Sequence, residues 1–324
     1  MSDPFVRTVR GDVRPDALGP VNYHEHFFQV SPLLPGDELC DEDAGIQEAR
    51  QLVASGFPAV VDATPLGLGR KPLGLRRVSA EAAVSIVATT GRHRDAHYSD
   101  QDWILELGAE RMGELFTADL VEGMPIDDRA LAPGAGTVAR SDVRAGVLKA
   151  GIDYWTITAA EREAIAAVGI AHRATGAPVM VHTEYCTAVD LALDLLEAAG
   201  VPAERVVIAH ADRTPDAGLH SAIAARGAYV GYDGAGRYKE WPDSVLLGAL
   251  EALVAAGAGD RILLGADVAR SSRYRAYGGV PGLEYLGRAF VPRLRERVGT
   301  PAVETITTVN AARWLTWSPT RARS

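Results

Sequence analysis

The chain has 324 residues, of which 47% are hydrophobic and 23% are charged, so a wholly disordered chain is excluded. Its 33 basic and 42 acidic side chains give a net charge of −9, which argues against general binding to nucleic acid. No apolar run is long enough for a membrane span, the first residues lack the apolar stretch of a signal peptide, and Cys40 and Cys186 cannot form a disulfide framework. We therefore expect a cytoplasmic protein without nucleic-acid or membrane partners.

Short apolar segments alternate with longer amphipathic ones along the chain. The short segments predict eight strands, at residues 20–24, 59–63, 84–89, 145–149, 178–182, 206–210, 228–232 and 262–265. The longer ones predict helices, among them residues 103–116, 159–175, 188–199, 243–256 and 283–298. This alternation predicts a single-domain (β/α)8 TIM barrel with its core at about residues 19–315.

Two local features refine this prediction. Thr158 is the expected N-cap of the helix at 159–175, and Gly176 is its expected stop. The stretch at 123–136 is rich in Gly, Pro and Asp, and we interpret it as a long surface connection rather than a linker between domains.

Metal-binding side chains stand at the ends of several predicted strands. His24 and His26 are two residues apart, so in an extended chain they point the same way and can converge on one ion. The alternative is a pair of exposed histidines just past a strand. His182, His210 and Asp267 follow three later strands, and in a barrel all these ends open on one face. Four histidines and an aspartate suit Zn2+ or a similar ion.

Lys149 closes an apolar strand, which is unusual because an ammonium group loses its hydration there. One interpretation is a lysine that reaches the barrel mouth or pairs with a carboxylate. The other is an amine converted by carbon dioxide to an N-carboxylate, an anion that can bridge two metal ions.

These residues, in this order, resemble the phosphotriesterase family of the amidohydrolase superfamily over nearly the whole chain. The segments that carry the resemblance are His24-Glu25-His26, Lys149, His182-Thr183, Ile208-Ala209-His210-Ala211-Asp212, Asp267 and Asn310-Ala311-Ala312-Arg313. The resemblance implies two divalent ions, Zn2+ with Mn2+ or Co2+ as alternatives, and a homodimer.

The resemblance also implies a role for each residue. His24, His26 and Asp267 would hold a buried ion, and His182 and His210 a more exposed one. Carboxylated Lys149 and a hydroxide would bridge the two ions, and Asp267 would act with Lys149 in catalysis by accepting the proton of the attacking hydroxide.

Two positions differ from the family members that hydrolyse organophosphates. Those enzymes carry two consecutive acidic residues after the sixth strand, where this chain has Asp212 and Arg213. They carry an Asp-His pair after the seventh strand, where this chain has Asp233 and Gly234. The proton relay of those enzymes is therefore incomplete here, which argues against phosphotriester turnover as the main task.

The loops after the last three strands are basic, although the chain is acidic. The residues concerned are Arg213, Arg237, Lys239, Arg270, Arg273 and Arg275. Six cations around one mouth predict a site for a substrate phosphate or carboxylate, and the alternative is an ordinary solvated surface. We also expect substrate contacts from His93 and Tyr98, and a structural role for His172 and His220 inside helices.

The sequence thus favours a metal-dependent hydrolase that opens a sugar lactone or another small anionic lactone by attack of a metal-bridging hydroxide. The first alternative is a phosphotriester hydrolase. The second is a non-catalytic barrel that binds a ligand, although such a protein has no need of Lys149 and Asp267 at these positions.

Overall fold

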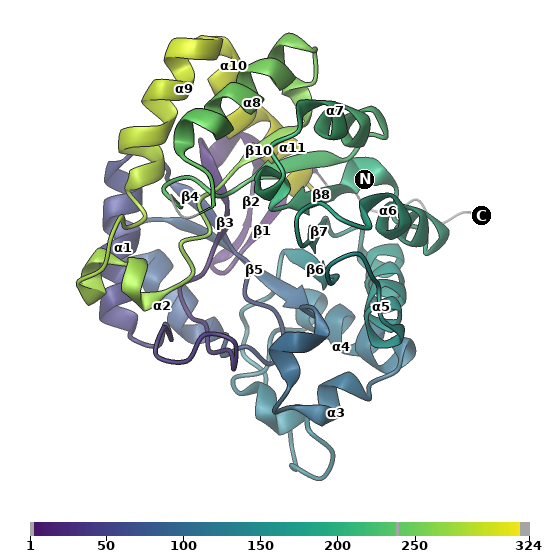
Figure 1. Ribbon diagram of the computed structural model, residues 1–324. Coiled ribbons are helices and arrows are strands. Elements are labelled where there is room, and N and C mark those ends of the chain that lie inside the picture. The colour runs from purple at the N-terminus through teal and green to yellow at the C-terminus, as the bar shows by residue number, and fades with distance from the viewer. Residues whose placement is uncertain (1–2, 238–239, 318–324) are drawn as a thin grey trace.

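The computed structural model describes residues 3–237 and 240–317 and confirms the predicted barrel. The parallel strands run round it in chain order (Figure 1). They are β3 (Val21–Glu25), β4 (Ala59–Asp62), β5 (Ser85–Gly91), β6 (Val147–Gly151), β7 (Val179–His182), β8 (Val206–Ala209), β9 (Tyr229–Tyr232) and β10 (Ile262–Leu264). At the seam, β10 packs against β3, and the backbone N–H of Asp267 donates to the carbonyl of His24 over 3.0 Å.

Helices surround the ring of strands and cover its outer face (Figure 1). They are α1 (Glu42–Ala54), α2 (Pro72–Ala82), α3 (Asp102–Leu105), α4 (Ala109–Val121), α5 (Ala159–Thr175), α6 (Val189–Ala198), α7 (Ala217–Ala225), α8 (Asp243–Ala255), α9 (Val291–Val298), α10 (Thr300–Glu304) and α11 (Asn310–Leu315). In the part of the chain that the structure describes, no helix is both long and apolar enough to cross a membrane.

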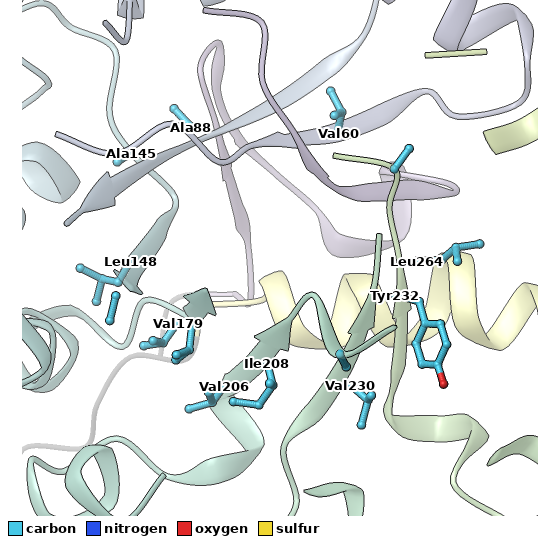
Figure 2. Packing of buried hydrophobic residues seen from close by; sticks show 14 of the residues in the cluster. Val60, Ala88, Ala145, Leu148, Val179, Val206, Ile208, Val230, Tyr232 and Leu264 are labelled. Carbon is cyan, nitrogen blue, oxygen red and sulfur yellow. The ribbon is translucent and has the colours of Figure 1, made fainter. Parts of the chain in front are cut away.

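Alternation along the strands divides the core into two layers. One parity packs against the helices, and Figure 2 shows members of this layer such as Val60, Leu148 and Ile208. The other parity fills the barrel, with residues such as Val147 and Met180. Side chains two residues apart on a strand share a face, so Lys149 and His182 also belong to the inner parity. The apolar pattern therefore directs both polar groups into the barrel.

Two glycines allow the close approaches that the barrel interior needs. Gly91, in β5, has a left-handed φ of 121°, and a Cβ there would overlap the backbone of Lys149. A Cβ at Gly231 would overlap the hydroxyl of Tyr23, which crosses the barrel interior. Any other residue at these two positions would displace groups that border the metal-ligand candidates.

Helix α5 begins and ends where the sequence predicts. The Thr158 hydroxyl accepts from the N–H of Glu161 over 3.1 Å, and the Glu161 carboxylate accepts from the N–H of Thr158 over 3.0 Å. Gly176 ends the helix with a φ of 76°. His172 in this helix and His220 in α7 are buried and bonded to nearby oxygens, which confirms their structural role.

The structure differs from the predicted elements at several places. An antiparallel hairpin of β1 (Val6–Thr8) and β2 (Gly11–Val13) precedes the barrel, and three-residue strands leave too short a pattern to recognise. The helix predicted at 103–116 is divided into α3 and α4, because the extended residue Gly108 caps α4. The helix predicted at 283–298 has its regular α-helical part only in α9, preceded by a wider helical turn at Leu286–Phe290.

The connection at 123–136 is fixed to the barrel by a buried ion pair. Nε and Nη2 of Arg70 donate to the two carboxylate oxygens of Asp128, each over 2.8 Å. Arg70 also pairs with Asp119 over 2.8 Å, so this connection is anchored to α4 and to the loop after β4.

Candidate metal centre

The six residues predicted as metal ligands come together at the carboxyl ends of the strands. They line a cavity of about 320 Å3, and all six side chains are buried. The six are His24, His26, Lys149, His182, His210 and Asp267. Lys149 does not end its strand as predicted, because β6 continues to Gly151.

Hydrogen bonds on the outer side of His24 and His26 fix which ring nitrogen of each faces the cavity. Nδ1 of His24 lies 3.2 Å from Oδ2 of Asp233, a carboxylate that can only accept. Nδ1 of His26 lies 2.7 Å from the Thr64 hydroxyl, which donates its own proton to the carbonyl of Phe28. Both Nδ1 atoms therefore carry the proton, and both Nε2 atoms present a lone pair.

Those two lone pairs face another acceptor. Nε2 of His24 lies 3.7 Å from Oδ1 of Asp267, and Nε2 of His26 lies 3.4 Å from the same oxygen. Burial lowers the pKa of His26 to about 4, so this imidazole is neutral at pH 7. The three atoms lie within 4.8 Å of one another, as ligands of one ion do.

His182 and His210 form a second pair with the same property. Nε2 of His182 lies 3.0 Å from the Glu184 carboxylate, and Nδ1 of His210 lies 2.7 Å from Oδ1 of Asp233. The opposite nitrogens, Nδ1 of His182 and Nε2 of His210, face each other over 2.7 Å. Burial lowers the pKa of His210 to about 3 and that of His182 well below its usual range.

Four imidazoles and a carboxylate thus direct ring nitrogens and an oxygen at one another in a buried space. This arrangement is repulsive for hydrogen bonding, but it is the donor set that divalent zinc and similar cations prefer. The outer hydrogen bonds are those that orient metal-bound histidines in proteins. The residues present therefore fit a metal centre.

Asp233 accepts several of the hydrogen bonds that orient the histidines from outside the cavity. Besides His24 and His210, it accepts from the Tyr23 hydroxyl. Burial alone would raise the pKa of Asp233, but the interactions with His210 and His24 hold it well below its usual range. His24, His210 and Asp233 also lie close enough together to hold one ion, but the hydrogen bonds described above account for their closeness.

Lys149 is buried beside the histidines. Its Nζ donates to the carbonyl of Ala63 over 2.9 Å. Burial lowers the pKa of the amine to about 8, although Asp267 and Asp233 favour the charged form. The protonated form therefore predominates at pH 7, but the free amine is present as a minor fraction.

Asp267 lies between the histidines and the basic side of the cavity. Its Oδ2 and its carbonyl oxygen contact the Arg237 guanidinium. Burial opposes ionisation, but Arg237 and His24 hold the pKa of Asp267 well below its usual range. Asp267 is therefore an anion, as a metal ligand must be.

The basic side of the cavity is lined by five arginines, of which four have acidic partners. Arg94 and Arg213 pair with Glu184 over 3.2 and 2.8 Å, and Arg270 pairs with Asp37 over 3.5 Å. The fourth, Arg237, pairs with Asp267 as described above.

Arg273 is the exception among these arginines. Within residues 3–237 and 240–317 its guanidinium has no hydrogen-bond or ion-pair partner. Burial and the charges of Arg237 and Arg270 lower the pKa of Arg273. An anion in the cavity would relieve this repulsion.

The comparisons with known proteins agree with this geometry. The model of the phosphotriesterase family matches residues 4–315. The chain belongs to the phosphotriesterase family. This membership makes it a hydrolase that acts on lactone or ester bonds.

Similar proteins in this family include a phospho-furanose lactonase of Mycoplasmopsis synoviae, 29% identical over 315 residues that cover 91% of this chain and 87% of the relative. Among solved structures, a lactonase from Listeria monocytogenes is 29% identical, with a TM-score of 0.84 over 97% of this chain and 99% of that one. A phosphotriesterase homology protein from Escherichia coli, with phosphate in its active site, is 26% identical, with a TM-score of 0.83 over 93% and 99% of the two chains.

Some residues predicted to contact substrate in this phosphotriesterase-family barrel lie elsewhere. Tyr98 is fully buried behind the cavity wall, where its hydroxyl donates to the carbonyl of Leu66 and accepts from the N–H of His93. Arg275 lies outside the cavity and pairs with Glu284 over 2.8 Å. Neither residue lines the cavity, because position after a strand does not say which way a loop side chain turns. Lys239, like Tyr238, lies outside the described residues.

His93 does line the cavity, and its ring centroid lies 4.2 Å from that of His182. Its Nδ1 accepts from the N–H of Arg94 over 2.9 Å, so its Nε2 carries the proton and is a donor. The predictions from the sequence do not include three further functional candidates, namely Thr64, Arg94 and Glu184, and they mark Asp233 only as a position that differs from the organophosphate-hydrolysing enzymes. A signal existed for Asp233, which directly follows β9, and for Glu184, which lies two residues after His182.

Proposed function

We propose that this protein is a metal-dependent lactonase that opens a small anionic lactone, with phosphorylated or carboxylated sugar lactones as the preferred class. One observation carries the proposal: a single cavity holds the converging ring nitrogens of four histidines and the guanidinium of Arg273, which has no partner among the described residues. The histidines supply a centre for hydrolysis, and the guanidinium supplies the anchor for an anion.

Two divalent ions would be held, with zinc as the favoured metal. His24, His26 and Asp267 would hold one ion, and His182 and His210 would hold the second. When bound, such ions lower the pKa of the attacking water and polarise the carbonyl oxygen of the ester.

Lys149 would supply an anionic ligand after carboxylation. The unprotonated amine adds to carbon dioxide, forms a carbon–nitrogen bond and releases one proton, so that a neutral amine becomes a carbamate anion. The lowered pKa of Lys149 increases the fraction of amine able to react. The anion would reduce the repulsion between two neighbouring metal ions.

Asp267 would accept the proton of the attacking water and pass it to the alkoxide that leaves when the lactone ring opens. Its Oδ2 touches Arg237, which fixes the orientation of the carboxylate. Attack forms a bond between the water oxygen and the carbonyl carbon, and collapse breaks the ring carbon–oxygen bond. The products are a carboxylate and an alcohol in one chain.

Arg273 would bind the phosphate or carboxylate of the substrate, supported by the neighbouring charges of Arg270 and Arg237. The names of two similar proteins agree with this class, since one is called a phospho-furanose lactonase and another holds phosphate in its active site. Phosphotriester hydrolysis is the weaker candidate. Asp233 is already hydrogen-bonded to His24 and His210, and Arg213 is paired with Glu184, so neither is available for the proton relay of the organophosphate-hydrolysing enzymes.

A substrate panel tests the proposal. Metal-loaded protein is mixed with neutral sugar lactones, phosphorylated sugar lactones, acyl-homoserine lactones and an aryl phosphotriester, and the acid released from each lactone is followed with a pH indicator. We expect the highest kcat/KM for a phosphorylated or carboxylated sugar lactone, with loss of turnover after chelation. Turnover of the phosphotriester alone, or of nothing in the panel, would overturn the proposal.

A further inference from the structure

Glu184 occupies an unexpected place for an acidic residue, on the basic side of the cavity. It lies two residues after His182, the last residue of β7. Its Oε1 lies 3.0 Å from Nε2 of His182 and 3.2 Å from Nε of Arg94. Its Oε2 accepts from Nη1 of Arg213 over 2.8 Å. One carboxylate therefore joins a candidate metal ligand to two arginines.

The contact with His182 decides the state of that imidazole. A carboxylate oxygen accepts hydrogen bonds, so Nε2 of His182 donates to Glu184 and Nδ1 keeps its lone pair. That lone pair is the one that faces His210. Without Glu184, the proton of His182 would be free to move to Nδ1, and the ring would be free to rotate away from its partner.

The two arginines have a role in this arrangement that differs from binding substrate. The side chains of Arg94 and Arg213 are 20% and 15% exposed, against 16% for Glu184, so the three form a partly buried cluster. The ion pair with Arg94 and the charged hydrogen bond from Arg213 fix the position of this carboxylate. The arginines hold Glu184, and Glu184 holds His182.

We propose that Glu184 is a positioning residue for the second metal ion, the one that His182 and His210 would hold. Arg213 then acts through Glu184 rather than by binding the anionic group of the substrate. This inference rests on the proposed function, since it concerns the same metal centre. It divides the arginines of the cavity into two kinds. Arg94 and Arg213 serve the metal centre, and Arg273 serves the substrate.

The first test measures metal binding directly. Metal-free protein is titrated with Co2+, and visible absorption follows the two binding steps. We expect Glu184→Ala to weaken one step by about 10- to 100-fold, the usual cost of losing a group that orients a ligand. Glu184→Gln keeps an oxygen that can accept from His182, so it should lose less affinity than Glu184→Ala. Glu240→Ala is the control, because Glu240 lines the same cavity but has no contact with His182 among the described residues.

The second test separates Arg213 from Arg273 by kcat/KM for a phosphorylated and a neutral sugar lactone. We expect Arg213→Ala to weaken one Co2+ step and to lower both values in parallel. Arg273→Ala should leave both Co2+ steps unchanged and lower only the value for the phosphorylated lactone. The Arg213 variant also tests the proposal if Glu184→Ala does not fold.

The outcomes distinguish this inference from the function itself. Wild-type protein that binds no Co2+ and opens no lactone would overturn the proposed function. Wild-type protein that binds two ions, with Glu184→Ala and Glu184→Gln binding them equally well, would overturn only the role of Glu184. Selective loss of the phosphorylated lactone in Arg213→Ala, with unchanged Co2+ binding, would show that Arg213 binds substrate and would also overturn it.

Discussion

Asp233 accepts a hydrogen bond from Nδ1 of His210 over 2.7 Å, and its second oxygen lies 3.2 Å from Nδ1 of His24. One buried carboxylate thus orients a histidine from each of the two proposed metal positions. Those positions are separated along the chain, with His24 in β3 and His210 after β8. The two halves of the centre are therefore coupled through a residue outside the proposed set of metal ligands.

This coupling predicts that Asp233→Asn weakens both metal-binding steps. An asparagine oxygen can accept from one imidazole, but its amide group has protons where the second imidazole also has one. We expect affinity for both ions to fall by about 10- to 100-fold, as measured by Co2+ titration. Asp190→Asn is the control, since Asp190 is exposed and pairs with Arg226 at the surface. Unchanged binding of both ions by Asp233→Asn would contradict the coupling.

A second prediction concerns Lys149 and the metal content. Purified protein should contain close to two divalent ions, and Lys149→Ala should lose metal and turnover together, because the bridging carbamate is gone. Added short carboxylic acids should restore part of both by taking the place of the carbamate. Lys71→Ala is the matched control, since Lys71 is not among the cavity-lining residues, and its amine donates to the carbonyl of Cys40 and lies over the ring of Phe28. Full metal content and turnover in Lys149→Ala would refute the role of the lysine.

The sequence predicts the barrel and the ligands because both depend on strand periodicity. Val147 and Lys149 share a face, as do Met180 and His182, so an apolar strand with a polar end specifies a side chain directed into the barrel mouth. The order of such ends along the chain then gives the site without any knowledge of the loops.

The loops resist this reasoning, because their side chains have no fixed period. Tyr98 and Arg273 both follow strands, yet one is buried behind the wall and the other faces the cavity. The role of Glu184 depends on Arg94 and Arg213, which come from two other loops. Contacts of this kind are set by tertiary packing and have no local signature.

Asp267 provides a third prediction. Asp267→Asn keeps the size of the side chain but removes the base and one anionic ligand, so we expect kcat to fall by about 10²- to 10⁴-fold or more. Metal content must be measured in the same sample, because loss of the ion alone also stops turnover. Normal turnover by metal-loaded Asp267→Asn would remove Asp267 from the proton transfer.

The two cysteines offer a check on the packing around the site. Cys40 is exposed, whereas Cys186 is buried beside the β7 loop, where burial raises the pKa of its thiol to about 12. A thiol reagent such as DTNB should therefore titrate one group in native protein at pH 8 and two in denaturant. Cys40→Ser should leave no fast-reacting thiol. Rapid reaction of two thiols in native wild-type protein would show that the loop after β7 is open.

Arg273 and Arg275 allow a direct test of the anionic substrate, because they lie two residues apart on one loop. Arg273 faces the cavity without a partner in the described part of the chain, whereas Arg275 points away and pairs with Glu284. A hydrogen bond between charged groups contributes about 1.5–3 kcal/mol, so Arg273→Ala should lower kcat/KM for a phosphorylated lactone by about 10- to 100-fold. The neutral lactone should lose far less, and Arg275→Ala should resemble wild type with both substrates. Equal losses for the charged and neutral lactones in Arg273→Ala would mean that the guanidinium supports the cavity wall and that the substrate carries no anion at this position.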